Sequence, residues 1–309
     1  MDILVSGSMA YDRIMDFNGA FSDHILPDQL DNINVSFTVN SLTENFGGTA
    51  GNIAYSLSLL GEKPRILATI GQDYHRYFEW LKQIGVPTAD IRIVEEELTA
   101  GAYITSDTSS NQITGFNPGA MKQQSGFNFD SVDPDNCLAI VAPGNLGDMA
   151  DYTAEHEKRG IFSIFDPGQS LPAWQADALS TAIRQSNILV CNDYEMEMIS
   201  NTTGMSREQV AGTVDTIVVT KGGDGSDIIT SDGTVSVPVV PASDAVDPTG
   251  AGDAFRGGLI KGLIGSLPIE RAVQMGNVAG HYAVRILGTQ QHSFTIDEFN
   301  TTLEQHFGK

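Results

Sequence analysis

Short apolar runs alternate with amphipathic stretches along this chain, and no other sequence feature constrains its fold as strongly. Strands are expected at residues 3–8, 65–70, 138–142, 161–165, 188–191 and 216–220. Helices are expected at residues 49–60, 75–84, 149–159, 174–183, 194–200, 251–264, 269–287 and 295–305. Continuous apolar strands separated by helices indicate a mainly parallel sheet that is covered on both faces. We therefore predict an α/β fold, with a single domain over residues 1–309.

Two segments, at about 12–45 and 98–117, interrupt this alternation. Residues 34–39 alternate between apolar and polar side chains as a half-exposed strand does, and short apolar runs flank a polar turn at 107–111. We predict that the two segments leave the main sheet and pair with each other. They would form a small β-sheet lid over the carboxyl edge of the sheet, where open α/β folds bind ligands.

The charge balance narrows the classes of partner. The chain has 17 Lys and Arg against 39 Asp and Glu, for a net charge of −22. Nucleic acids and anionic membranes need dense basic patches, so neither is expected as a partner. No secretory signal or membrane-spanning stretch is visible, and Cys137 and Cys191 are expected to be buried free thiols. We therefore expect a cytoplasmic protein.

The sharpest motif is DPTGAGDAF at residues 247–255, which begins a predicted helix. Backbone N–H groups of Gly250, Ala251 and Gly252 can converge there, and a helix N-terminus adds about half a positive charge. The motif therefore predicts an anion site that needs no lysine. A carboxylate at Asp253 could accept the proton of a hydroxyl that attacks a phosphoryl group. Such a glycine-rich turn by itself more often only starts a helix.

Three further motifs occur in a consistent order: NFGGTAGNIA at 45–54, NDYE at 192–195 and TKGGDG at 220–225. Together with DPTGAGDAF they resemble the signatures of the PfkB family, the ribokinase-like carbohydrate and nucleoside kinases. The resemblance covers the whole chain. It implies a three-layer α/β/α sandwich with a mainly parallel central sheet and a small β lid. It also implies transfer of the ATP γ-phosphate to a primary hydroxyl, with Mg²⁺ as cofactor.

The resemblance assigns roles on the phosphate-donor side. Asp253 would be the catalytic base, and Gly250, Ala251 and Gly252 would hold the transferring phosphoryl group. Asn192 and Glu195 would position the phosphates and Mg²⁺, with Glu195 acting through water. The nucleotide would be lined by Thr220, Gly222, Gly225 and Asn277. A monovalent cation such as K⁺ would lie near Asp247 and Thr249.

On the acceptor side, the resemblance implies that Asp12 and Asn52 bind vicinal hydroxyls while Gly47 and Gly48 admit the substrate to the backbone. Ser8 and Gln169 are further candidates, and Phe116 would either stack on a nucleobase or pack within the lid. The step from Ser8 to Asp12 is similar to that of adenosine and other nucleoside kinases. We therefore expect a nucleoside, adenosine first, to be phosphorylated on its 5′-hydroxyl.

Other interpretations remain open at the level of sequence. The acceptor could be a free sugar such as ribose or fructose, or the chain could be a catalytically silent homologue that binds nucleoside or sugar. It could act as a monomer or as a homodimer formed through the lid.

Overall fold

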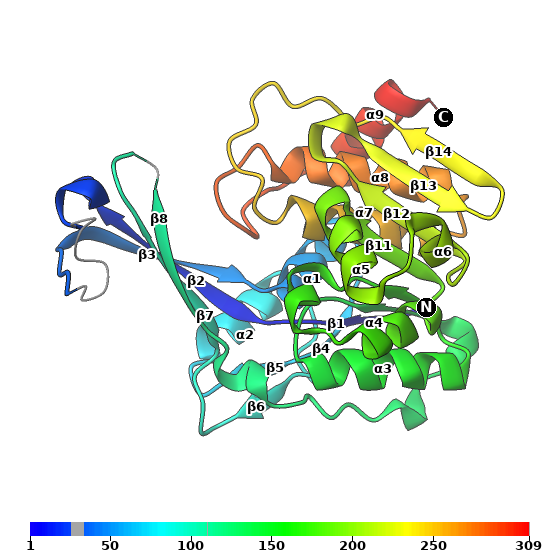
Figure 1. Cartoon of the computed structure of the whole chain (residues 1–309), viewed down its shortest axis with the longest axis horizontal. Coiled ribbons are helices and arrows are strands. Elements are labelled where there is room, and N and C mark those ends of the chain that lie inside the picture. The colour runs from blue at the N-terminus through cyan, green and yellow to red at the C-terminus, as the bar shows by residue number, and fades with distance from the viewer. Residues whose placement is uncertain (26–33, 110, 309) are drawn as a thin grey trace.

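The computed structural model describes residues 1–25, 34–109 and 111–308, and an eight-stranded sheet forms its centre (Figure 1). The strand order is β14-β13-β12-β11-β10-β9-β1-β4. The strands from β4 to β12 are parallel, while β13 and β14 run antiparallel at one edge. Their bounds are β1 Asp2–Ser6, β4 Arg65–Leu67, β9 Cys137–Val141, β10 Phe162–Phe165, β11 Ile188–Asn192, β12 Thr216–Thr220, β13 Ser226–Thr230 and β14 Gly233–Val237.

Helices cover both faces of this sheet because successive strand residues point to opposite sides. In β1, Ile3 and Val5 join one core cluster and Leu4 joins the other. The first cluster packs against α1 (Thr49–Leu59), α2 (His75–Gln83), α7 (Ala251–Ile264) and α8 (Ile269–Ala283). The second packs against α3 (Leu146–Arg159), α4 (Ala176–Arg184), α5 (Asp193–Thr203) and α6 (Arg207–Ala211). Helix α9 (Ile296–Phe307) packs on α8. With helices on both faces of the sheet, the body has three layers.

A second sheet of four strands projects from this body (Figure 1). Its order is β3-β2-β7-β8, with bounds β2 Ala10–Phe17, β3 Val39–Gly47, β7 Ala100–Ser106 and β8 Gln112–Asn117. We call this sheet the lid sheet. Strand β2 follows β1 after a short turn, so the chain runs directly from the body into the lid sheet. The predicted lid segments also contain residues 26–33 and 110, which lie outside the described residues.

Several local predictions were wrong for identifiable reasons. The strand expected at residues 34–39 begins only at Val39 and runs to Gly47. As an edge strand exposed on both sides, β3 has no apolar alternation to reveal it. The expected strand at 65–70 is divided, because β4 pairs with β1 while β5 (Thr69–Gly71) pairs with β6 (Arg92–Val94). The β13–β14 hairpin was not predicted, because two strands joined by a tight turn do not show the alternation of strand and helix.

One prediction about the body, that of the cysteines, was confirmed. Cys137 in β9 and Cys191 in β11 are buried free thiols, and burial raises the pKa of Cys137 to about 12. Within the part of the chain that the structure describes, no helix is both long and apolar enough to cross a membrane.

Candidate active site

The carboxyl ends of the central strands open into two adjoining clefts. One, of about 480 Å³, lies against the lid sheet and is called the acceptor cleft. The other, of about 450 Å³, reaches the ends of β11 and β12 and is called the donor cleft. Four residues line both clefts: Thr49, Gln169, Gly250 and Asp253. A group transferred from one cleft to the other would therefore pass Asp253.

Two glycines before α1 shape the floor of the acceptor cleft. Gly48 has φ +87°, and a Cβ there would lie 2.6 Å from the carbonyl oxygen of Ser8. Gly47 does not line the cleft itself, but a Cβ on it would lie 2.5 Å from Oδ2 of Asp12. Gly47 thus leaves room for the Asp12 carboxyl group, which points into the cleft from β2. Burial raises the pKa of Asp12, and the Thr289 hydroxyl lies 3.5 Å from its Oδ2.

Other predicted acceptor residues differ in what they offer a ligand. Ser8 lines the cleft, but its hydroxyl accepts the backbone N–H of Thr49 at 3.0 Å and so fixes the start of α1. Phe116 lines the cleft from β8 and is 54% exposed, which leaves its ring free to stack on a ligand. Gln169 lies on the loop after β10, between the two clefts.

The N-terminus of α7 forms the wall between the clefts. The sequence predicted that the N–H groups of Gly250, Ala251 and Gly252 hold a phosphoryl group, and in this structure the Ala251 N–H donates to the Pro248 carbonyl at 3.1 Å and closes the turn. The N–H groups of Gly250, Gly252 and Asp253 have no backbone acceptor within the described residues. These three groups lie at the positive end of the helix dipole and form the candidate anion site.

The pKa of Asp253 indicates its chemistry in the site. Burial raises its pKa to about 6, while the Arg256 guanidinium and a hydrogen bond from Asn52 oppose this shift. Nδ2 of Asn52 donates to Oδ2 of Asp253 at 2.8 Å. A carboxyl group with a pKa near neutrality is suited to act as a general base.

Beneath the donor cleft lies a buried ion pair that the sequence analysis missed. Nε of Arg256 donates to Oδ2 of Asp166 at 2.7 Å, and Nη2 donates to Oδ1 at 3.1 Å. Arg256 lies one turn after Asp253 in α7, whereas Asp166 directly follows β10. The ion pair places a cation beside the anion site, which suits a chain with few basic residues. Its partners are 90 residues apart, so no local pattern could reveal the pairing.

Asn192 and Glu195 line the donor cleft and also form a capping box at the start of α5. Oδ1 of Asn192 accepts the Glu195 N–H at 2.7 Å, and Oε2 of Glu195 accepts the Asn192 N–H at 2.8 Å. This leaves Oε1 of Glu195 for another ligand. The described residues hold no cluster of three metal-ligating side chains. Mg²⁺ typically uses one or two carboxylates, several waters and substrate phosphates, and a single carboxylate oxygen beside the anion site fits that pattern.

The remaining donor-side predictions divide into two groups. Thr220 and Gly222 line the donor cleft, but Gly225, Asn277 and Asp247 line neither cleft. The amide group of Asn277 accepts from Ser226 at 3.1 Å and donates to Pro238 at 3.0 Å inside the fold, so its place beside the nucleotide stays a prediction.

Asp247 and Gly225 each have a structural role in the fold. The Asp247 carboxyl accepts the N–H groups of Thr249 and Gly288, at 2.9 and 2.8 Å. Gly225 has φ +86° at the turn into β13. Thr249 lines the acceptor cleft.

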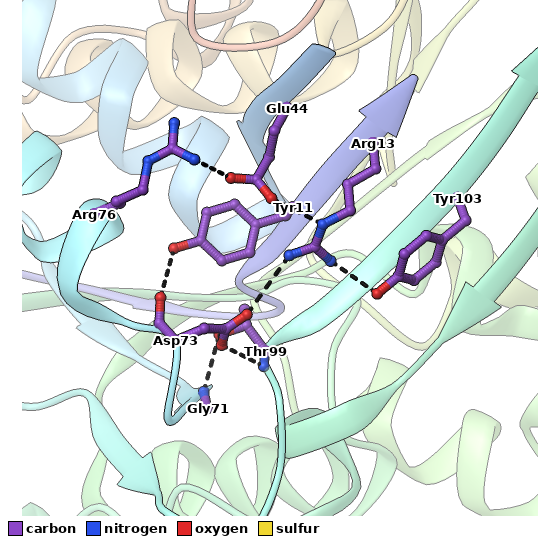
Figure 2. Close-up of polar contacts among 8 residues, drawn as sticks. All are labelled: Tyr11, Arg13, Glu44, Gly71, Asp73, Arg76, Thr99 and Tyr103. Carbon is purple, nitrogen blue, oxygen red and sulfur yellow. Dashed lines mark hydrogen bonds and ion pairs between the residues drawn. The ribbon is translucent and has the colours of Figure 1, made fainter. Parts of the chain in front are cut away.

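The lid sheet is joined to the body by a polar cluster on the face away from Asp12, which Figure 2 shows. Arg13 donates to Glu44 at 2.8 Å and to the Tyr103 hydroxyl at 3.0 Å, so it connects three lid strands. Its Nη2 also lies 3.6 Å from Oδ2 of Asp73, in the turn between β5 and α2. Asp73 in turn accepts the Thr99 N–H at 2.8 Å. The cluster holds the root of the lid sheet against the body.

Comparison with known proteins agrees with this geometry. The pfkB family carbohydrate kinase model matches residues 5–295. A nucleoside kinase from Methanocaldococcus jannaschii is 30% identical over 278 residues, covering 88% of this chain and 90% of that protein. A nucleoside kinase from Methanothermobacter thermautotrophicus is 28% identical, over 94% of this chain and 91% of that protein.

Solved structures give the same result. The structure of a Burkholderia thailandensis nucleoside kinase in complex with inosine has a TM-score of 0.87 and 38% identity, covering 99% of this chain and 98% of that one. A Thermotoga maritima ribokinase at 23% identity and a TM-score of 0.81 shares the fold. The predicted ribokinase-like sandwich with its small lid sheet is thus confirmed. The chain belongs to the pfkB family of carbohydrate kinases.

Proposed function

We propose that the chain is an ATP-dependent kinase that transfers the γ-phosphate to the 5′-hydroxyl of a nucleoside, with adenosine the first candidate. The observation that carries this proposal is the position of Asp253. It lies where the two clefts meet, next to the free N–H groups at the start of α7. A base and an anion site side by side are what phosphoryl transfer to a hydroxyl requires.

Each step can be assigned to residues of this chain. Asp253 accepts the proton of the acceptor hydroxyl as that oxygen attacks the γ-phosphorus and the bond from phosphorus to the bridging oxygen of the leaving ADP breaks. The N–H groups of Gly250, Gly252 and Asp253 donate to the phosphoryl oxygens, whose negative charge they stabilise without reorganising. Glu195 would hold Mg²⁺ through water, and that ion would neutralise charge on the ATP phosphates. Arg256, fixed by Asp166, adds a positive charge beneath the donor cleft.

The shape of the acceptor cleft favours a nucleoside over a free sugar. Asp12, Asn52 and Asp253 line this cleft, and their polar groups suit ribose hydroxyls. The same lining extends to Phe116 and Met121, which offer an aromatic face and an apolar contact to a base. Relatives described as nucleoside kinases, among them one in complex with inosine, support this assignment.

An acceptor panel tests the proposal. Purified protein with ATP and Mg²⁺ is given adenosine, inosine, cytidine, ribose or fructose, and ADP formation is followed. We expect turnover of nucleosides, with adenosine ranked by its kcat/KM against inosine. Turnover of ribose or fructose alone would favour a sugar kinase. Tight nucleoside binding without ADP in any reaction would favour a silent binding homologue.

We also propose that residues 1–309 act as one domain whose lid segments, at about 12–45 and 98–117, close over the bound acceptor. Closure would exclude water that otherwise competes for the γ-phosphate.

Omitting Mg²⁺, or replacing K⁺ by Na⁺, tests the two cations. The case for a K⁺ site near Asp247 and Thr249 is weaker, because the Asp247 carboxyl already accepts two N–H groups. Light scattering distinguishes a monomer from a homodimer formed through the lid.

A further inference from the structure

A chain of hydrogen bonds reaches Asp253 from behind the acceptor cleft. Nε1 of Trp80, in α2, donates to Oε1 of Gln290 at 2.8 Å. Nε2 of Gln290, in the loop between α8 and α9, donates to Oδ1 of Asn52 at 3.0 Å. Asn52, in α1, then donates from Nδ2 to Asp253 at 2.8 Å. Four residues from four separate segments are therefore linked in one direction, from an indole to the proposed base.

The direction of this chain of hydrogen bonds is set by Trp80, at the end far from Asp253. An indole N–H can only donate, so Gln290 must turn its carbonyl oxygen towards Trp80. Its NH₂ group then faces Asn52, which leaves the Asn52 NH₂ group for Asp253. A second contact agrees, because Gln290 Nε2 also donates to the Tyr77 hydroxyl at 2.7 Å while that hydroxyl donates to the Gly47 carbonyl at 2.8 Å.

The backbone conformation at Gln290 shows that placing this buried side chain requires local strain. Gln290 has φ +56°, in the left-handed region that a non-glycine residue rarely adopts, and it is only 2% exposed. A Cβ at Gly51 would overlap the Tyr77 hydroxyl and lie 3.0 Å from Gln290 Nε2. A strained glutamine and a glycine that makes room for it support a specific task for this buried amide.

We propose that Trp80 and Gln290 are positioning residues for phosphoryl transfer, acting through Asn52 to hold Asp253 as an ionised and correctly turned base. Oδ2 of Asp253 receives the Asn52 NH₂ group. Oδ1 has no hydrogen-bond partner among the described residues, so it is available to the acceptor hydroxyl. A reversed Asn52 amide would place its carbonyl oxygen against the carboxylate, which disfavours the ionised form.

Apart from Tyr77, whose hydroxyl accepts from Gln290, the other groups that face Asp253 have no hydrogen bond to the Trp80 or Gln290 side chain among the described residues. Arg256 of α7 favours the ionised form, while Asp166 after β10 and Asp12 of β2 oppose it. Tyr77 of α2 is neutral, because burial raises its pKa. Glu195 of α5 faces Arg256. Altering Trp80 leaves all of these charges in place, so a change in the titration of Asp253 would report the amide chain.

The test is the Trp80→Phe variant, which removes the indole N–H but keeps a ring between Phe46 and Tyr55, whose centroids lie 5.6 and 5.9 Å away. We expect kcat to fall about tenfold, the scale of one hydrogen bond to a charged group, with little change in nucleoside KM. The acid limb of the kcat profile should move about one pH unit higher. Gln290→Met should do the same, and the double variant should be no worse than Gln290→Met alone.

Tyr55→Phe is the matched control, because it removes a buried hydroxyl from the same aromatic stack, and among the described residues that hydroxyl bonds only the His292 carbonyl. It should keep the wild-type pH profile. The inference rests on the proposed function for its acceptor, so ¹³C NMR of labelled Asp carboxyls, assigned with Asp253→Asn, provides a readout that needs no acceptor. If the wild type phosphorylates nothing, the proposed function fails while the titration still tests the positioning. Unchanged Asp253 titration and acid limb in folded Trp80→Phe and Gln290→Met would overturn the inference.

Discussion

At the scale of single residues, the proposed reaction depends on a carboxyl group whose ionisation is disfavoured by burial in the fold. Burial raises the pKa of Asp253 to about 6, and only Asn52 and Arg256 oppose that shift among its main neighbours. A base of this kind is ionised at neutral pH, yet it binds a proton more readily than an ordinary aspartate. Its protonation state should therefore be visible both in catalysis and in folding stability.

The first prediction concerns catalysis. Because a protonated Asp253 cannot accept the hydroxyl proton, kcat/KM for the nucleoside should fall below about pH 6, by up to about tenfold per pH unit. Steady-state rates between pH 5 and 8, with Mg²⁺ and ATP saturating, measure this limb. A flat profile down to pH 5 would contradict the assignment of Asp253 as the base.

The second prediction concerns the Asp253→Asn variant. Turnover should fall by roughly 10²–10⁴, the usual contribution of a positioned base, while nucleotide binding is kept. Since the folded-state pKa of about 6 exceeds the ordinary 3.8, the wild type loses stability as the pH rises from about 4 to 6. Above pH 6 the variant should be more stable, on the order of 1 kcal/mol after allowing for solvent in the cleft. Denaturant unfolding at pH 4 and 7 measures the difference.

At the scale of elements, the lid sheet has one face for the ligand and one for attachment. Asp12 and Arg13 are neighbours in β2, so their side chains point to opposite faces. Asp12 lines the acceptor cleft, while Arg13 joins the polar cluster of Figure 2. Strand β2 therefore carries both Asp12, the candidate substrate-binding residue, and Arg13, which attaches the lid sheet to the body.

The third prediction tests this attachment with Arg13→Met. The change leaves partly buried Glu44 and Asp73 without this cation, so unfolding free energy should fall by about 1–3 kcal/mol. A looser lid root should raise the nucleoside KM and the rate of ATP hydrolysis without acceptor. Arg76→Met is the matched control, because Arg76 contacts the same Glu44 with a side chain that is 66% exposed. Its effect should stay within about 0.5 kcal/mol. Equal effects of the two variants would argue against a special role for Arg13.

At the scale of the whole molecule, a net charge of −22 coexists with a site for a phosphate donor. The anion site depends on backbone N–H groups and a helix dipole, and Arg256 is the cation that lines the donor cleft. Of the described residues that line the acceptor cleft, none is Lys or Arg, whereas Asp12 and Asp253 are acidic. The donor cleft is lined by Asp166, Asp193, Glu195 and Asp253 as well, so the difference between the clefts is Arg256, which the acceptor cleft lacks.

The fourth prediction follows from that difference. Phosphorylated acceptors such as fructose 6-phosphate should be poor substrates, because their phosphate would enter a cleft with two carboxyl groups and no cation. We expect kcat/KM at least about 100-fold below that for adenosine, equivalent to about 2.7 kcal/mol of lost stabilisation. ADP release with both acceptors at equal concentration measures the ratio. A comparable rate on fructose 6-phosphate would refute this use of the charge distribution.

The sequence by itself determined the parallel sheet, the two covered faces, the family and the position of Asp253, because these follow from local periodicity and contiguous motifs. The lid sheet was predicted as an element, although β3 was misplaced because an exposed edge strand has no apolar alternation. Other features depend on residues that only the fold brings together. The Arg256–Asp166 pair and the chain from Trp80 through Gln290 to Asn52 join positions 90 to 238 residues apart. The tertiary structure also decided which partners the Asn277 amide and the Ala251 N–H bind within the fold, because the partners of a polar group depend on which residues the fold brings within reach.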